Sequence, residues 1–120
     1  LARLLPHVDA MNIDLKGWQE DFYRWVGGDL GTVRETIEHA VTHGVHVEVT
    51  TLIIPGRNDS AADMDAAARW LASLSPEIPL HISRYFPRHR VSTPPTPVAA
   101  IDRLAKIARR HLRHVHRGNC

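Results

Sequence analysis

The sequence feature that most constrains the fold of this chain is the regular alternation of short apolar segments with longer amphipathic segments. Residues 45–54 are rich in β-branched side chains and end at Pro55-Gly56, which is typical of a strand closed by a tight turn. Similar runs predict three further strands at residues 8–15, 80–86 and 114–117. Strands that alternate with helices are typical of right-handed βαβ crossovers, so the sequence predicts an α/β fold with a parallel sheet.

Three of the intervening helices are marked by capping residues. The predicted starts are Thr32 with Glu35 as a capping box, Asp59 or Ser60, and Thr96 as a cap with Pro97 at the first helical position. Gly44 is expected to end the first of them. A shorter helix is predicted over residues 18–26, and the four prolines of residues 87–97 predict a stiff loop.

Apolar residues recur at helical spacing along one side of each of these three helices, and we expect them to form the buried faces. They are Val33, Ile37, Ala40 and Val41, then Met64, Ala67, Ala68 and Leu71, and finally Val98, Ile101, Leu104, Ala105 and Ala108. The first strand is expected to be mostly buried, because Met11, Ile13 and Leu15 alternate with polar residues.

The length of the chain limits how much of a larger α/β fold it can hold. At 120 residues it makes one domain at most, whereas a complete α/β barrel needs roughly 200 residues or more. The hydrophobic content of 43% and the charged content of 23% are ordinary for a soluble globular domain. No apolar run approaches the ~20 residues of a membrane span, and the first residues do not form a signal peptide. The chain does not begin with Met, which we interpret as a fragment boundary.

Cysteine use and charge exclude some classes of site and partner. The single cysteine, Cys120, cannot make an internal disulfide, so we expect a cytoplasmic protein, and one thiol cannot hold a four-iron cluster. The net charge is +2, and basic residues concentrate between Arg103 and Arg117. We interpret them as a solvated helix face, and a nucleic-acid site is disfavoured because no aromatic residues are interleaved to stack on bases.

In parallel α/β folds, ligands bind beyond the carboxyl ends of the strands. The first predicted strand ends with Asn12, Asp14 and Lys16 on one face, because side chains alternate along a strand. A carboxylate and an ammonium together suit a zwitterionic ligand, since each can pair with the opposite charge of that ligand. The alternative is an exposed ion pair at a strand end.

Other polar residues follow the second and third strands. Candidates with a possible ligand role are His46, Glu48 and Thr50 on the second strand, Ser83, Arg84 and Tyr85 on the third, and Asn58 and Asp59 after the Pro55-Gly56 turn. His46 and Glu48 could be a proton pair or two metal ligands, but we favour the interpretation that they face solvent or hydrogen-bond to each other. His111, His114 and His116 straddle a helix end and a strand start, so we expect their directions to diverge.

Three ordered motifs resemble a known family. They are VDAMNIDLKG at residues 8–17, TTLIIPGRND at residues 50–59 and ISRYFP at residues 82–87. Together they resemble radical S-adenosylmethionine (radical SAM) enzymes of the pyruvate formate-lyase activating enzyme type, and look closest to the AmmeMemoRadiSam system radical SAM enzyme. The resemblance covers nearly the whole chain, and it implies the C-terminal half of a partial (β/α)6 barrel of the TIM type.

The resemblance also implies cofactors and residue roles. It implies an enzyme that binds S-adenosylmethionine (SAM) and a [4Fe–4S] cluster and generates a 5′-deoxyadenosyl radical. Asp14 and Lys16 match the family's SAM contacts, and Thr50 holds the position of a polar residue that lies near SAM in the family. Ser83, Arg84 and Tyr85 are candidates to line the same site. Activating enzymes proper have a His just after that Tyr, whereas this chain has Phe86, so a His contact does not carry over.

One motif of the family is absent from the chain. The C-x3-C-x2-C loop that would supply three thiolates to the cluster is expected upstream of Leu1, so the isolated chain is expected to be inactive. The substrate, and whether it is a protein or a small molecule, is not indicated by the sequence. Two alternatives stay open: a class I aldolase-type barrel with Lys16 as Schiff-base nucleophile, and a non-enzymatic basic α/β binding module.

Overall fold

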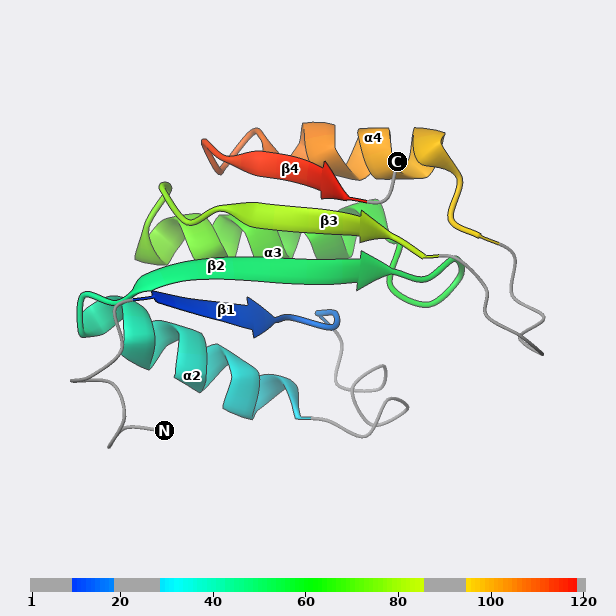
Figure 1. The fold of residues 1–120 in the computed structure, drawn as a ribbon. Helices are drawn as coiled ribbons and strands as arrows, with labels where there is room; N and C mark the ends of the chain where they lie inside the picture. Colours follow the sequence, from blue (N-terminus) through cyan, green and yellow to red (C-terminus); the bar gives the residue numbers. More distant parts are fainter. Residues whose placement is uncertain (1–9, 19–28, 86–94, 119–120) are drawn as a thin grey trace.

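The computed structural model describes residues 10–18, 29–85 and 95–118 (Figure 1). Along the chain, the elements are β1 (Ala10–Asp14), α2 (Leu30–Thr42), β2 (His46–Ile53), α3 (Ala61–Leu74), β3 (Leu80–Arg84), α4 (Val98–Ala108) and β4 (Val115–Gly118). The strands form one sheet in the order β1-β2-β3-β4, and every neighbouring pair is parallel. The predicted α/β class with parallel strands is therefore confirmed.

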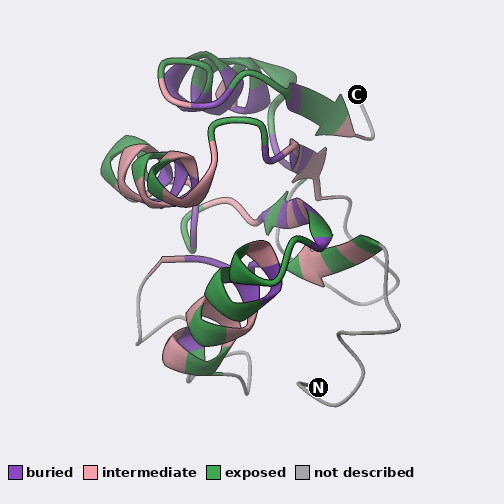
Figure 2. Ribbon diagram, turned by 90° about the vertical axis from the view of Figure 1, so that its left-hand side faces the viewer, coloured by how far each residue is buried: buried purple, intermediate pink, exposed green. Residues whose placement is uncertain are grey.

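The two faces of this sheet differ in what covers them. The helices lie along one face, as Figure 2 shows, and the side chains that point to them form the core. Val49, Ile53 and Ile82 are fully buried there, which contributes roughly 1.5–3 kcal/mol for each side chain. Among the described residues, no helix covers the opposite face, and we call it the open face. It is mostly polar, and it carries Asn12, Asp14, His46, Glu48, Thr50, Leu52, His81, Ser83 and His116.

Two of the three predicted helix starts need correction. Helix α2 is capped by Asp29, whose Oδ1 accepts from the N–H of Gly31 at 2.9 Å, and not by a Thr32–Glu35 capping box. Thr32 instead donates from its hydroxyl to Asp29. Asp and Thr are both common N-cap residues, and here Asp29, which comes first in the chain, accepts from an N–H of the first helical turn. The predicted start of α3 is confirmed, because Ser60 caps it through the N–H of Asp63.

The start of α4 differs from the prediction for a physical reason. Pro97 is the cap residue, and it has no side-chain hydrogen bond. Thr96 is completely buried, and its hydroxyl donates to the Ile53 carbonyl at 2.5 Å instead of capping the helix. The same hydroxyl accepts from the N–H of Tyr85 at 3.1 Å. Thr96 therefore joins the carboxyl ends of β2 and β3, which the capping pattern did not indicate.

The predicted buried faces of the helices are confirmed with two kinds of exception. Val98 is 39% exposed because it lies in the first turn of α4, and Val33 and Val41 are only half-buried. Gly44 has φ +74° directly after α2, so its predicted role in ending that helix is confirmed.

The prediction that the first strand is mostly buried is only partly confirmed: Leu15, just after β1, is buried, and Met11 and Ile13 are half-buried against the core. None of Ala10–Asp14 is buried, because β1 has β2 as its only neighbour within the described residues. The predicted helix at residues 18–26, the loop at residues 87–97 and Cys120 lie largely or wholly outside the described residues. No helix in the described ranges is long and apolar enough to span a membrane.

Candidate functional site

The carboxyl end of β1 carries two opposite charges in contact. The Nζ of Lys16 lies 2.9 Å from Oδ2 of Asp14, so the two side chains converge as their spacing predicts. Their exposed fractions are 45% for Lys16 and 58% for Asp14. The pair is thus accessible to a ligand, and by itself it has the geometry of an exposed ion pair, which in water contributes little to stability.

The adjacent strand adds hydrogen-bonding groups to this pair. Thr50 is the register partner of Asp14, and its hydroxyl donates to Oδ1 of Asn12 at 3.1 Å. Asn12, Asp14 and Thr50 share the open face, because residues two apart on a strand point the same way. The first two strands therefore present a carboxylate, an ammonium, an amide and a hydroxyl at one edge of the molecule.

Asn58 holds this edge in place. The side chain is buried, and its Nδ2 donates to the carbonyls of Lys16 and Leu52, at 2.8 Å in both cases. Its Oδ1 accepts from the N–H of Ile54 at 2.7 Å. One amide thus fixes the turn after β2 and ties it to the backbone of Lys16, across 42 residues of chain.

The sequence indicated a possible ligand role for Asn58, whereas in the structure its side chain makes this bridge. Gly56 makes the turn possible, since it has φ +74°, a left-handed conformation that favours glycine. In the sequence, the only indication of this role is the position of Asn58 two residues after Gly56. The contact with the Lys16 carbonyl in the structure reveals the role.

The candidates on β3 separate to the two sides of the sheet. Ser83 lies on the open face, where it pairs in register with Leu52 and with Gly118. A Cβ at Gly118 would lie 2.8 Å from Oγ of Ser83, so the hydroxyl occupies the space that the glycine leaves. Arg84 points the other way and donates from Nε to the Thr96 carbonyl at 2.5 Å. Tyr85 is half-buried and follows Ser83 on the open side.

Since β2 separates β1 from β3, Ser83 and Tyr85 lie about two strand spacings, or roughly 10 Å, from the Asp14–Lys16 pair. The structure therefore brings Asp14, Lys16 and Thr50 together, keeps Ser83 and Tyr85 on the same face at a distance, and turns Arg84 away from them.

A second polar cluster lies nearer the amino ends of the strands on the open face. Glu48 accepts from His81 at 2.6 Å and lies 3.3 Å from Nε2 of His46, while the ring of His116 stacks on that of His81 with centroids 5.0 Å apart. The hydrogen bond from His81, followed by the one from His46, holds the pKa of the Glu48 carboxyl below its usual value. The predicted mutual pairing of His46 and Glu48 is confirmed.

The three late histidines diverge as predicted. His111 contacts Asp65 of α3 at 2.7 Å, His114 lies 3.5 Å from Glu77, and His116 stacks on His81. Within residues 10–18, 29–85 and 95–118, no group of three or more His, Cys, Asp or Glu side chains could hold a metal ion.

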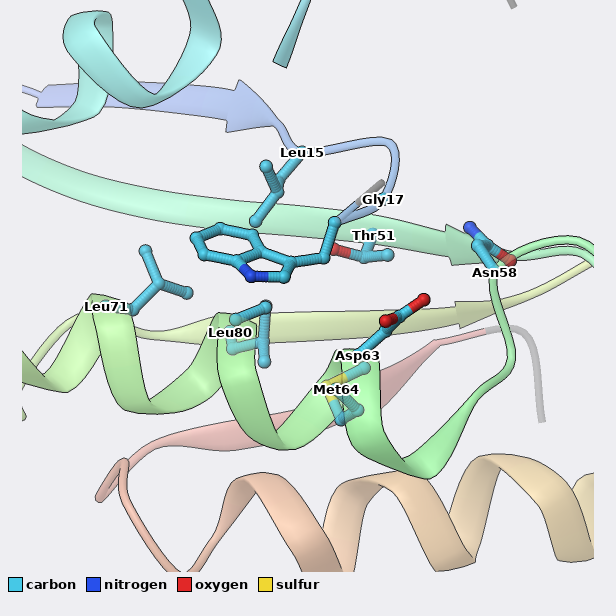
Figure 3. A pocket seen from close by; sticks show the side chains of 10 residues that line it. Leu15, Gly17, Thr51, Asn58, Asp63, Met64, Leu71 and Leu80 are labelled. Carbon is cyan, nitrogen blue, oxygen red and sulfur yellow. The ribbon is translucent and has the colours of Figure 1, made fainter. Parts of the chain in front are cut away.

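A small pocket lies on the helix-covered side of the sheet. Figure 3 shows it between Leu15, Leu71 and Leu80, with Asp63 and Asn58 near its mouth. Its volume is about 20 Å³, far below the roughly 300–1,000 Å³ of typical ligand pockets. We interpret it as a gap in packing, and the open face remains the better candidate site.

Comparison with known proteins shows which fold the chain has. Among solved structures, the chain is similar to a domain of pyruvate-formate lyase-activating enzyme from Bacteroides vulgatus, with a TM-score of 0.81 and 18% sequence identity. The match covers 97% of this chain and 71% of that one. The chain shares the fold of that activating-enzyme domain. At this identity the likeness concerns the fold alone.

A curated relative matches in sequence but has no assigned function. The uncharacterized protein MJ0808 of Methanocaldococcus jannaschii is 40% identical over 121 residues. The match covers 98% of this chain and 36% of the relative, so the chain spans about a third of that protein's length. No protein-family model matches the chain.

The geometry also bears on the aldolase alternative. A Schiff-base lysine is typically desolvated in an apolar pocket or placed beside another cation. Lys16 is 45% exposed and lies against a carboxylate, which is neither of these two environments.

Proposed function

We propose that this chain is the C-terminal part of a radical SAM core domain of the activating-enzyme type, and that it binds SAM at the carboxyl ends of β1 and β2. The observation that carries the proposal is the Asp14–Lys16 pair, which is exposed beside Thr50 on the open face. The shared fold with an activating-enzyme domain and the three ordered motifs support it.

The groups present fit the chemistry of SAM. The methionine end of SAM carries an ammonium and a carboxylate, and its ribose carries two hydroxyls. Lys16 would bind the carboxylate or the ribose oxygens, and Asp14 would accept from the ammonium or the hydroxyls. Because Asp14 and Lys16 already neutralise each other, the ammonium and carboxylate of SAM can replace each partner without leaving either of these two side chains unpaired.

Whether the other candidate residues can contact SAM depends on whether their side chains lie on the open face. Thr50 would add a hydroxyl directly beside the pair, and Ser83 and Tyr85 would line the far side of the same face. A contact from Arg84 would have to use its terminal nitrogens, since Nε is bonded to the Thr96 carbonyl.

The iron–sulfur cluster does not fit this chain. The sequence contains one cysteine, whereas a [4Fe–4S] cluster of this kind takes three or four thiolates. We therefore place the cluster ligands, and with them the chemistry of radical formation, in another part of the parent protein. Bound to such a cluster, SAM supplies the 5′-deoxyadenosyl radical, and the residues of this chain orient the cofactor and exclude water. The cytoplasm is the proposed compartment.

Because the chain lacks the cluster ligands, the test of this proposal is binding and not turnover. SAM is titrated into the full 120-residue chain by calorimetry, alongside the Asp14→Asn and Lys16→Met variants. Each substitution removes a charge-assisted contact, so each should weaken SAM binding by about tenfold or more. Lys106→Met removes an exposed lysine of α4 and should leave the affinity unchanged. Equal affinity in all four proteins, or no measurable SAM binding by the wild type, would refute the proposal.

A further inference from the structure

A basic groove lies at the end of the sheet opposite β1. It runs between α4 and β4, has an open volume of about 450 Å³, and is lined by Asp102, Arg103, Lys106, Arg109 and Arg117. All five lining residues are exposed. We refer to it as the α4–β4 groove, and nothing in the proposed SAM site uses it.

The positive charges of this groove are mostly uncompensated. Asp102 pairs with Arg117, and Arg109 donates one N–H to the Val115 carbonyl at 3.2 Å. Arg103 and Lys106 make no ion pair or side-chain hydrogen bond within the part of the chain that the structure describes. Four cations face one acid, so the groove has a local charge of about +3, larger than the +2 of the whole chain. Such a surface attracts anions.

The spacing of the cations indicates an extended anion. Arg103, Lys106 and Arg109 are three residues apart along α4, so they span about 9 Å at the rise of an α-helix. That is too long for one carboxylate or phosphate. Two carboxylates on alternate residues of an extended peptide, which lie about 6.6–6.8 Å apart on one side, fit within that span.

The construction of the groove favours carboxylates over phosphates or nucleic acid. Phosphate sites commonly use free backbone N–H groups at a helix start, but Arg103 to Arg109 lie in the body and last turn of α4, where those N–H groups are bonded within the helix. No aromatic residue lines the groove, so bases would find no stacking surface. The planar guanidinium of an arginine can also bind one carboxylate through two parallel hydrogen bonds.

We propose that the α4–β4 groove is a docking site for an acidic peptide segment of a partner protein. Arg103 and Lys106 are the main determinants, because they are the cations without an internal partner in the described structure. The Arg117–Asp102 pair joins β4 to α4 within the groove.

The test uses a fluorescein-labelled octapeptide of alternating Glu and Ser, titrated with the full chain at low salt and followed by anisotropy. The Arg103→Glu/Lys106→Glu variant should bind it at least about tenfold more weakly, since two attractions become repulsions. The matched control, Arg57→Glu/Arg110→Glu, makes the same change in net charge at exposed positions outside the groove, and should reduce affinity far less.

Two further arms complete the test. Raising the salt to about 0.5 M should abolish binding, because the charges are exposed and become screened. A thymidine octanucleotide should bind more weakly than the peptide. The proposal fails if the wild type does not bind the peptide, if both double variants lose affinity equally, or if the oligonucleotide binds the groove more tightly. Circular dichroism of the Arg103→Gln/Lys106→Gln variant, which should also lose binding, checks that the fold is kept.

Discussion

At the scale of single residues, the candidate site depends on one buried amide. Asn58 donates to the carbonyls of Lys16 and Leu52 and accepts from the N–H of Ile54, three backbone groups at the edge of the core. Because the bond to Lys16 is to its backbone, Asn58 fixes where the lysine side chain starts and leaves the ammonium free to reach Asp14. It is thus a positioning residue for the proposed SAM site.

We predict that Asn58→Asp destabilises the fold. The new carboxylate can still accept from Ile54 but turns an oxygen toward the two carbonyls, so two hydrogen bonds are lost and replaced by repulsion. The expected loss is about 2–4 kcal/mol in the free energy of unfolding, measured by urea denaturation. Asp59→Asn makes the reverse exchange at the next position, which has no such bridge, and should change stability by less than about 0.5 kcal/mol. Similar losses in the two variants would contradict the role given to Asn58.

At the scale of elements, the polar cluster on the open face joins β2 to β3. Glu48 of β2 accepts from His81 of β3 and from His46 of its own strand, and His116 of β4 stacks on His81. The register partner of Glu48 on β1 is Asn12, which carries no charge. The carboxylate of Glu48 therefore has donors on two strands and no acidic neighbour opposite it.

Because of these hydrogen bonds to Glu48, part of the free energy of unfolding depends on pH. The pKa of Glu48 is lower in the folded chain than its ordinary value of 4.5, so the unfolded chain binds the proton more readily. The contribution of Glu48 is complete above about pH 4.5, and it is lost as the pH falls through the folded pKa.

We predict that Glu48→Gln removes this part of the acid dependence. Urea denaturation between about pH 7 and pH 3 should show a smaller loss of stability for the variant than for the wild type. Glu35→Gln changes an exposed carboxyl of α2 and should keep the wild-type profile. Parallel acid profiles for the wild type and Glu48→Gln would show that the cluster does not stabilise the fold.

Element types could be predicted from the sequence because local patterns determine them. The β-branched run of β2 and the apolar stripe of α3 appear where expected, and the convergence of Asp14 and Lys16 follows from strand alternation. Local patterns could not show where a side chain bonds to a residue far away in the sequence instead of to its own helix. Thr96 has the sequence of a helix cap, but its hydroxyl binds Ile53, a residue 43 positions earlier. The exposure of β1 likewise depends on which strands are its neighbours, and the alternation of its residues does not reveal that.

At the scale of the whole molecule, the two ends of the sheet differ in charge, and we propose a different ligand for each. The β1–β2 end holds a balanced pair that suits a zwitterion, and the α4–β4 groove holds an excess of cations that suits a polyanion. Because α2, α3 and α4 lie along the other face (Figure 2), no helix of the described residues separates the open face from a ligand. A cofactor at one end and a protein segment at the other could then be bound at the same time.

The central claim is that SAM binds at the open face beside Asp14 and Lys16. The most direct test is to add SAM to the ¹⁵N-labelled chain and map which backbone amide signals shift. We predict that the largest shifts lie at Asp14–Lys16 and Thr50, with small ones at Ser83 and none along α4. Shifts confined to α4 and β4, or to the residues around the pocket of Leu71 and Leu80, or no shifts at all, would contradict it.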